Sequence, residues 1–210
     1  MAHIVLLGDS IFDNAAYVPA GTEVQARLQS LPGRPHRVSL LARDGSVLQD
    51  MAAQVARLRE LPVAADWLVV SCGGNDVLGL VGAMHSQVAT VLEAAELLAA
   101  WQAGFRRGYL DMLDLLSAQS SPVAVATIYD GVPGISPGLR TALAPSNDVI
   151  LREAVLRRLP VLDLRVVCDE AGDYASSSPI EPSGPGGRKI AAAVGGGVQA
   201  RSARAPHTLG

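Results

Sequence analysis

The stretch AHIVLLGDSIFDN, residues 2–14, predicts both the class of fold and the place of the functional site. Its first part, residues 2–7, is a short apolar run rich in branched side chains, which is typical of a buried strand. Gly8, Asp9 and Ser10 follow at once. A serine at the carboxyl end of the first strand of an α/β sheet lies where such sheets open their ligand crevice. By itself, however, the Gly-Asp-Ser tripeptide is equally typical of an ordinary turn.

Four more apolar runs predict the other strands of a sheet. One of them is DWLVVSC at residues 66–72, and the polar segment GGND follows it at residues 73–76. Three further strands are expected near residues 36–41, 123–129 and 160–167. Helical patterns separate the strands, and this alternation favours a parallel sheet covered by helices on both faces.

Helices are expected where apolar side chains recur at helical spacing. In the region 46–61, for example, Val47, Met51, Val55 and Leu58 fall on one face. Caps are expected at Thr22 and Asn147, whose side chains suit a helix N-terminus. The predicted helices cover residues 22–31, 46–61, 86–118, 147–158 and 186–194.

With the Gly-Asp-Ser block and the Gly-Gly-Asn-Asp block in this order, the chain resembles the SGNH hydrolases, the GDSL-type esterase family. The resemblance covers most of residues 2–195 and implies a three-layer α/β/α sandwich. Its five-stranded parallel sheet would have the flavodoxin-like order 2-1-3-4-5. The resemblance also implies that Ser10 is the nucleophile. The oxyanion hole would be formed by the Ser10 amide with Gly45 and Asn75, of which Gly45 rests only on its position after the second strand.

The sequence departs from the family pattern before its last helix. The family has Asp-x-x-His there, whereas this chain has SPIEPS at residues 178–183. Glu181 stands at the histidine position and Ser178 at the aspartate position. We expect Glu181 to point at the serine, as the histidine of the family does. A carboxylate in a partly apolar cleft gains proton affinity and therefore becomes a better base.

Two other residues are candidates for a supporting role. Arg43 precedes Gly45 by two residues, so a Ser10–Arg43–Glu181 arrangement is conceivable. Because arginine keeps its proton in proteins, its role would be orienting or charge-stabilising. The alternative interpretation of Arg43 is a surface ion pair with Asp44.

A histidine elsewhere in the chain is the alternative base. His3 and His36 begin strands, so each should lie a strand length, roughly 20 Å, from the serine. His207 falls in the C-terminal tail. His85 follows the third-strand loop on the active-site side, and it is therefore the alternative to Glu181.

Length and composition bound the class of protein. The chain has 210 residues, of which 49% are hydrophobic, and this predicts one domain with a sizeable core. We expect a hydrolase-like domain at residues 1–195 and a flexible tail at residues 196–210. The net charge is -3, and no basic cluster is flanked by aromatic residues, which argues against nucleic acid as a partner.

Other patterns indicate what the chain is not expected to contain. Cys72 and Cys168 lie in apolar runs and are interpreted as buried thiols of a reducing compartment. No carboxylates, histidines and cysteines are spaced as a metal cluster, so neither a metal nor a cofactor is predicted. The N-terminal apolar run is the first strand, so no signal peptide is expected. No run of about 18 apolar residues could span a bilayer, and a cytoplasmic protein is the default.

The leading hypothesis is an esterase in which Ser10 attacks a small carboxylic ester and forms an acyl-enzyme. The apolar loop through Val77, Leu78 and Leu80 is compatible with a short to medium acyl chain. A second hypothesis is a non-catalytic domain that binds an acylated or sugar-bearing ligand, because the usual Asp and His are missing. A transferase that passes the acyl group to another alcohol is a third. The sequence sets no oligomeric state.

Overall fold

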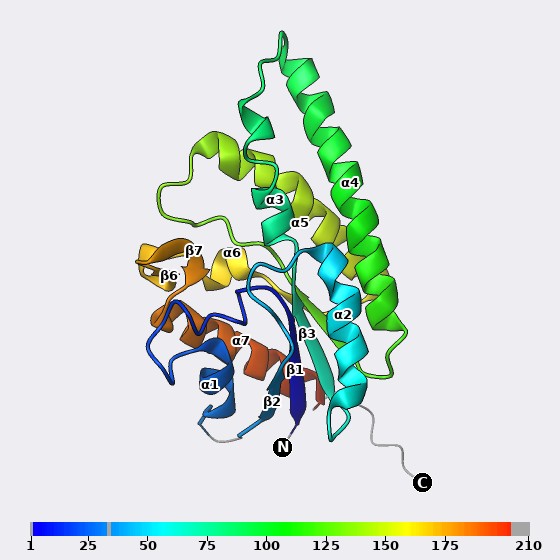
Figure 1. Cartoon of the computed structure of the whole chain (residues 1–210), viewed down its shortest axis with the longest axis vertical. Coiled ribbons are helices and arrows are strands. Elements are labelled where there is room, and N and C mark those ends of the chain that lie inside the picture. Colours follow the sequence, from blue (N-terminus) through cyan, green and yellow to red (C-terminus); the bar gives the residue numbers. More distant parts are fainter. Residues whose placement is uncertain (1, 33–34, 203–210) are drawn as a thin grey trace.

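A five-stranded parallel sheet runs through the centre of the molecule in the order β2-β1-β3-β4-β5 (Figure 1). The structure is a computed structural model that describes residues 2–32 and 35–202. The strands are β1 (His3–Gly8), β2 (Arg37–Leu40), β3 (Trp67–Ser71), β4 (Val123–Ala126) and β5 (Val161–Leu162). The predicted parallel sheet and its strand order are confirmed.

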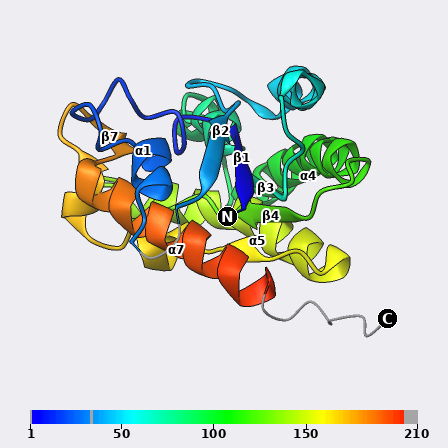
Figure 2. The same cartoon turned by 90° about the horizontal axis from the view of Figure 1, so that it is seen from below.

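Helices cover both faces of the sheet, as Figure 2 shows from below. Alternate residues of a strand point to opposite faces. In β1, Val5 and Leu7 join the core under α2, α4 and α5, whereas Ile4 and Leu6 join the core under α1 and α7. The predicted three-layer sandwich is therefore confirmed. The helices are α1 (Val24–Gln29), α2 (Met51–Ala56), α3 (Gly74–Leu78), α4 (Val91–Ser117), α5 (Pro137–Arg157), α6 (Leu164–Val167) and α7 (Gly184–Ser202).

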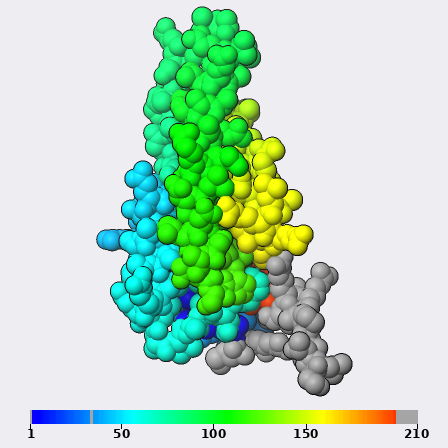
Figure 3. Space-filling view, turned by 90° about the vertical axis from the view of Figure 1, so that its right-hand side faces the viewer, coloured from blue at the N-terminus to red at the C-terminus, as the bar shows by residue number. Residues whose placement is uncertain are grey.

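Short elements connect these layers. A two-stranded antiparallel hairpin, β6 (Tyr174–Ala175) and β7 (Ser178–Pro182), precedes α7 and brings residue 181 to the carboxyl edge of the sheet. The longest helix, α4, runs as a ridge over one face of the molecule and packs against α5 (Figure 3). Short 3-10 turns are η1 (Leu48–Asp50), η2 (Arg57–Glu60), η3 (Ala83–His85) and η4 (Ala171–Asp173).

The predicted helix starts at Thr22 and Asn147 are wrong. Helix α5 begins ten residues before Asn147, where Ser136 caps the helix by accepting from the Leu139 N–H at 3.2 Å. Asn147 lies buried in the helix, and its amide bonds both the N–H and the carbonyl of Ile128 at 2.8 Å. It therefore satisfies backbone groups that β4 leaves unpaired where it ends.

At the start of α1, Thr22 instead donates its hydroxyl to the Pro19 carbonyl. The first N–H of the helix, that of Val24, is bonded by the side chain of Asn14 at 3.0 Å. The helix start is thus held by a residue of the loop after Ser10, which ties that loop to the layer of α1 and α7.

The predicted end of the last helix at residue 194 is also wrong. Helix α7 continues to Ser202, and the buried side chain of Val198 joins the same core as Val194 and Ile190. Three consecutive glycines, residues 195–197, predict the end of a helix. Gly195, however, packs close to the side chain of Leu31 beside α1, and a side chain at position 195 would require Leu31 to shift. The rest of the predicted tail, residues 203–210, lies outside the described residues.

A substitution at Gly8, the last residue of β1, tests the close contact between the backbones of β1 and β3. Gly8 has a φ of +118°, and a Cβ there would overlap the carbonyl group of Ser71 in β3. Gly8→Ala is therefore expected to lower the free energy of unfolding by more than about 3 kcal/mol, measured by urea denaturation.

Gly21 provides the matched control, since its φ of +82° is also positive but open space surrounds it. Gly21→Ala should show only the conformational cost of about 1–2 kcal/mol. Equal effects of the two substitutions would contradict the steric reason given for Gly8.

Candidate active site

The turn that carries Ser10 is fixed by hydrogen bonds on both sides of it. The Asp9 N–H donates to the carbonyl of Ser71 at 3.0 Å, which joins the turn to the end of β3. The Asp9 carboxyl accepts from the Ile11 N–H at 3.2 Å, as expected for a residue that holds the serine loop. The Ser10 side chain is consequently held at the carboxyl edge of the sheet in a buried position.

Ser10, Asn75 and Glu181 line one cavity of about 350 Å³ at this edge. They come from the end of β1, from the first turn of α3 and from β7. Their convergence follows from the strand order, because β1 and β3 are neighbours and the hairpin of β7 folds over their ends (Figure 1). The rest of the wall is mainly apolar and includes Val77, Leu78, Val81, Ile128, Val132 and Leu143.

Glu181 is the buried carboxyl group that faces the serine. Only 4% of the residue is exposed, and its Oε2 atom has no hydrogen-bond partner. Burial raises its pKa to about 7, a hydrogen bond with the Ser10 side chain acts in the opposite direction, and the negative charge of Asp44 raises it further. A carboxyl with this pKa takes up and releases a proton near neutral pH.

Hydrogen bonds to the residues on either side of Glu181 hold the strand β7 in place. The Tyr129 hydroxyl donates to the carbonyl of Ile180, and the Asn14 amide donates to the carbonyl of Pro182 at 3.3 Å. The hydroxyl comes from the segment after β4, and the amide comes from the loop after the serine. The position of the carboxyl group is therefore linked to that of the nucleophile.

Asp9 is a second carboxyl group beside the serine. It is buried, and burial raises its pKa to about 7, while the bond from Ile11 lowers it and the charge of Glu181 raises it. Two carboxyl groups that each disfavour the charge of the other are thus placed next to one hydroxyl.

Asn75 presents its side-chain amide at the cavity. One N–H of the amide donates to the carbonyl of Ser46 at 2.9 Å, which fixes the orientation of the group. A carboxamide carries two N–H donors, so a second donor remains for a ligand. This arrangement suits the stabilisation of a negative oxygen.

Gln54 is a residue of the site that the sequence analysis missed. Its buried side-chain amide accepts from the Gly8 N–H and donates to the Gly8 carbonyl, both at 2.7 Å, and donates to the Ser46 hydroxyl at 3.1 Å. The signal for it is present in the sequence, because Gln54 lies three residues after Met51 on the apolar face of the predicted helix. A polar residue on a core-facing stripe needs a buried partner.

The structure does not bring Arg43 and Gly45 into the cavity. Both lie in a separate shallow groove together with Asp44. Arg43 is exposed, and in residues 2–32 and 35–202 it forms no ion pair with Asp44. The loop lies near the cavity all the same, since the Ser46 carbonyl binds Asn75.

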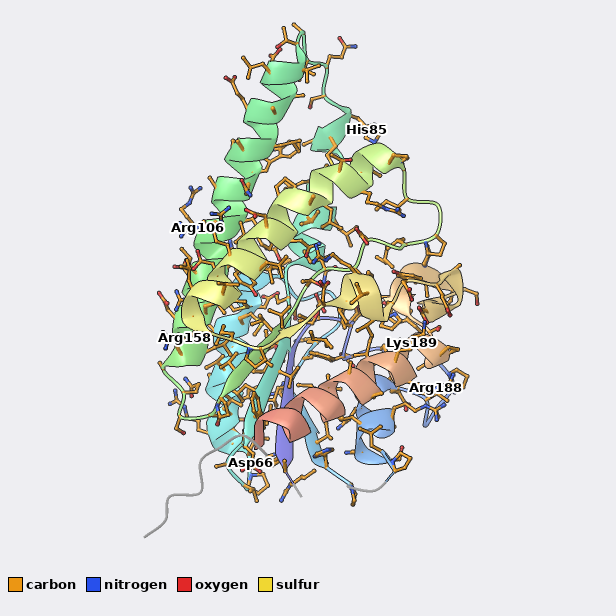
Figure 4. The ribbon with its side chains drawn as sticks, turned by 180° about the vertical axis from the view of Figure 1, so that it is seen from behind. Asp66, His85, Arg106, Arg158, Arg188 and Lys189 are labelled. Carbon is orange, nitrogen blue, oxygen red and sulfur yellow. The ribbon has the colours of Figure 1, made fainter. Side chains whose placement is uncertain are left out.

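No histidine is among the residues that line the cavity. His85 is exposed in η3 and borders a different hollow, and Figure 4 places it next to the start of α5. His3 and His36 lie at the amino ends of β1 and β2, as predicted. His207 lies outside the described residues. The carboxyl groups that line the cavity beside Ser10 are those of Glu181 and Asp9.

Two features of the described residues bear on other classes of site. Within them, no three His, Cys, Asp or Glu side chains are grouped so that they could hold a metal ion. No helix among them combines the length and the apolar character needed to cross a bilayer. Cys72 and Cys168 are buried free thiols.

Comparison with known proteins identifies the class to which this fold and site belong. Residues 6–188 match the GDSL-like Lipase/Acylhydrolase family, so the chain is a member of that family. Membership supports ester hydrolysis as the general class of activity. No curated protein matches the chain.

Solved structures share the fold at low sequence identity. A lipolytic protein of the G-D-S-L family from Veillonella parvula is 18% identical with a TM-score of 0.67, and the match covers 91% of this chain and 95% of that one. An alpha/beta hydrolase enzyme from the metagenome of Lake Arreo, Spain, is 18% identical with a TM-score of 0.70, and the match covers 94% of this chain and 95% of that one. An acetylxylan esterase from Geobacillus stearothermophilus, solved as a catalytic mutant, is 18% identical with a TM-score of 0.61, and the match covers 94% of both chains.

The buried carboxyl of Glu181 makes the stability of the fold depend on pH. Its pKa is about 7 in the folded protein against 4.5 in the free side chain. Between these values the folded state keeps a proton that the unfolded chain has lost, so the free energy of unfolding falls as the pH rises. Glu181→Gln should reduce this fall by up to about 3 kcal/mol, measured by urea denaturation from about pH 5 to pH 8.

The exposed carboxyl of Glu60 provides the control. Glu60→Gln is expected to keep the pH dependence of the wild type. The same dependence in the Glu181→Gln variant would show that this carboxyl is not buried as described.

Proposed function

We propose that the chain is a serine esterase in which Glu181 acts directly as the base, without a histidine. The observation that carries this proposal is the placement of Ser10 and the buried Glu181 carboxyl in one cavity whose lining contains no histidine. A serine hydroxyl needs such a base because it is a weak nucleophile at neutral pH. A carboxylate with a pKa of about 7 is far better suited to this than an exposed glutamate.

The reaction proceeds in two halves. Glu181 takes the hydroxyl proton of Ser10 as the Oγ atom attacks the ester carbonyl carbon. The tetrahedral intermediate then collapses, its C–O bond to the alcohol breaks, and the alcohol leaves with the proton from Glu181. A water molecule next gives a proton to Glu181 and attacks the acyl carbonyl carbon. The bond between this carbon and Ser10 Oγ then breaks, Glu181 returns the proton to Oγ, and the carboxylic acid is released.

The proposed donors to the oxyanion are the free N–H of the Asn75 amide and the backbone N–H of Ser10. Gly45, which precedes the Ser46 carbonyl that binds Asn75, lies outside the cavity and is assigned no donor role. Donors held in place before the reaction stabilise the transition state without further reorganisation. Arg43 has no place in this scheme, because it lies outside the cavity.

The apolar wall supports an acyl group as the part of the substrate that fills the cavity. Val77, Leu78 and Val81 come from α3 and the loop after it, and Ile128 and Leu143 face them from other elements. A cavity of about 350 Å³ suits a short to medium acyl chain. A domain that only binds such a ligand is the alternative, since the Asp and His of the family pattern are replaced.

Hydrolysis of p-nitrophenyl butyrate by matched variants tests the assignment of the base. Ser10→Ala should abolish turnover, and Glu181→Gln should lower kcat at least about 100-fold because it removes the base. In the wild type, kcat/KM should rise with pH through an apparent pKa near 7, as the carboxyl ionises. Glu60→Gln should leave both quantities unchanged.

The pattern of losses separates the alternatives. A Glu181→Gln variant with most of its activity would exclude this residue as the base. A wild type without turnover, together with no labelling of Ser10 by a serine-reactive phosphonate, would favour the binding domain.

Removal of the oxyanion donor should act on kcat. Asn75→Ala is expected to lower kcat by a factor of about 100–1,000, equivalent to about 2.7–4 kcal/mol, with a much smaller change in KM. The control is Gln49→Ala, which removes an exposed amide of η1. An effect of Asn75→Ala confined to KM would place the amide in ground-state binding instead.

A further inference from the structure

One buried oxygen atom of the site has no hydrogen-bond partner. Glu181 Oε2 is buried and accepts no hydrogen bond, although its residue is only 4% exposed. A buried carboxylate oxygen without a donor is destabilising, and such atoms are rare in folded proteins. Since the residue lines the cavity, a molecule that binds in the cavity is placed to supply the missing donor.

The surroundings of this atom are acidic. Asp9 lies beside Ser10 in the same cavity wall. On the outer side, Asp44 accepts from the Tyr17 hydroxyl at 2.7 Å, and the Asp44 N–H donates to the Asp13 carboxyl at 3.0 Å. The hydrogen bond to Asp44 is the largest cause that raises the pKa of Tyr17 to about 12, and the charges of Glu181, Asp44 and Asp13 add to it. Asp9 thus lines the cavity together with Glu181, whereas Asp44 lies outside the lining, and its negative charge still acts on Glu181.

No cation of the described part of the chain balances this charge. None of Asp9, Asp13, Asp44 and Glu181 takes part in an ion pair there, whereas eight ion pairs occur elsewhere in it. The lining of the cavity contains no lysine and no arginine. Arg43, the basic residue of the adjacent loop, is exposed in the separate groove.

We propose that the alcohol part of the ester substrate carries a protonated amine, which donates an N–H to Glu181 Oε2. This inference rests on the proposed function, in which the other side of the same carboxylate receives the proton of Ser10. The acyl part occupies the apolar wall, and the amine lies against Glu181 with Asp44 and Asp13 outside it. The covalent steps are unchanged, because the amine keeps its proton throughout and the ester C–O bond breaks as before.

Charge, and not hydrogen bonding alone, selects the amine over a neutral hydroxyl. A sugar hydroxyl could donate to Oε2, but it would leave the acidic residues unbalanced. A cation in this poorly solvated place gains from every nearby carboxylate, and a charge-assisted hydrogen bond is stronger than a neutral one. The bound cation also favours the ionised form of Glu181, which is the form that acts as the base.

Three matched butyrate esters test the proposal. Dimethylaminoethyl butyrate carries a cation with an N–H, choline butyrate carries a cation without one, and isopentyl butyrate is the neutral analogue of the first. At low ionic strength kcat/KM should be highest for the dimethylaminoethyl ester, by about 10-fold or more over the isopentyl ester. Choline butyrate should fall between them, and added salt should reduce both preferences.

Asp44→Asn is the diagnostic variant. It should lower the ratio of kcat/KM for the dimethylaminoethyl ester to that for the isopentyl ester several-fold, because it removes a negative charge and keeps the size of the side chain. The Glu60→Gln control should leave this ratio at its wild-type value. Equal kcat/KM for the two esters, or a ratio that neither salt nor Asp44→Asn changes, would overturn the proposal.

Binding measurements separate this inference from the proposed function. If none of the esters is hydrolysed, the esterase assignment fails, whereas the cation site is still examined by calorimetry with dimethylaminoethanol and isopentyl alcohol. Tighter binding of the amino alcohol, weakened by Asp44→Asn, would support the site. Equal affinities of the two alcohols would overturn it whether or not the protein is an esterase.

Discussion

The geometry of the site depends on the close approach of β1 to β3 at Gly8. The missing side chain lets the Gly8 backbone lie against the carbonyl of Ser71, and its positive φ turns the chain toward Ser10. Its own N–H and carbonyl are both bonded by the side-chain amide of Gln54. The same amide donates to the Ser46 hydroxyl, and the Ser46 carbonyl fixes Asn75. One buried glutamine therefore connects the nucleophile turn with the loop that holds the proposed oxyanion donor.

The proposed use of a glutamate where the family has a histidine has a physical explanation in the burial of the site. An ordinary glutamate, with a pKa of about 4.3, is a poor base toward a hydroxyl group, whereas imidazole titrates near 6.5. Burial in the apolar cavity brings the Glu181 carboxyl to about 7, close to imidazole. A carboxylate also needs no acidic partner to select a tautomer, which is one role of the aspartate beside a catalytic histidine. The serine at position 178 in place of that aspartate is consistent with this simpler arrangement.

The number and order of the strands could be predicted because the signals for strands are local. The strand expected near residues 160–167 is too long, however, because β5 ends at Leu162 and Asp163 caps α6. Each strand is an apolar run that ends in glycine or polar residues, and the order followed from the family resemblance. The errors occur where tertiary contacts override local preference. Asn147 suits a helix cap in isolation but is used inside α5 to bond Ile128. The helix continues through the glycines at 195–197, and Val198 beyond them is buried in the core. Gln54 was missed because its partner, the Gly8 backbone, lies 46 positions away in the chain. Ser10 and Glu181 could be placed together because both lie in motif blocks whose position in the fold was expected.

Burial gives the Glu181 carboxyl two properties that act together. Loss of water raises its pKa, so that a large part of the free protein holds the carboxyl in its neutral form near pH 7. Loss of water also strengthens any interaction of the carboxylate with a cation. A cationic substrate would therefore be recognised most strongly by the ionised form that the free site disfavours, and its binding would shift the carboxyl toward that form. Because substrate binding and proton release are linked, Glu181 would be ionised in the protein that has bound its substrate. Asp9, Asp44 and Glu181, which form no ion pair within the described residues, would in this way destabilise the empty site and prepare the occupied site for reaction.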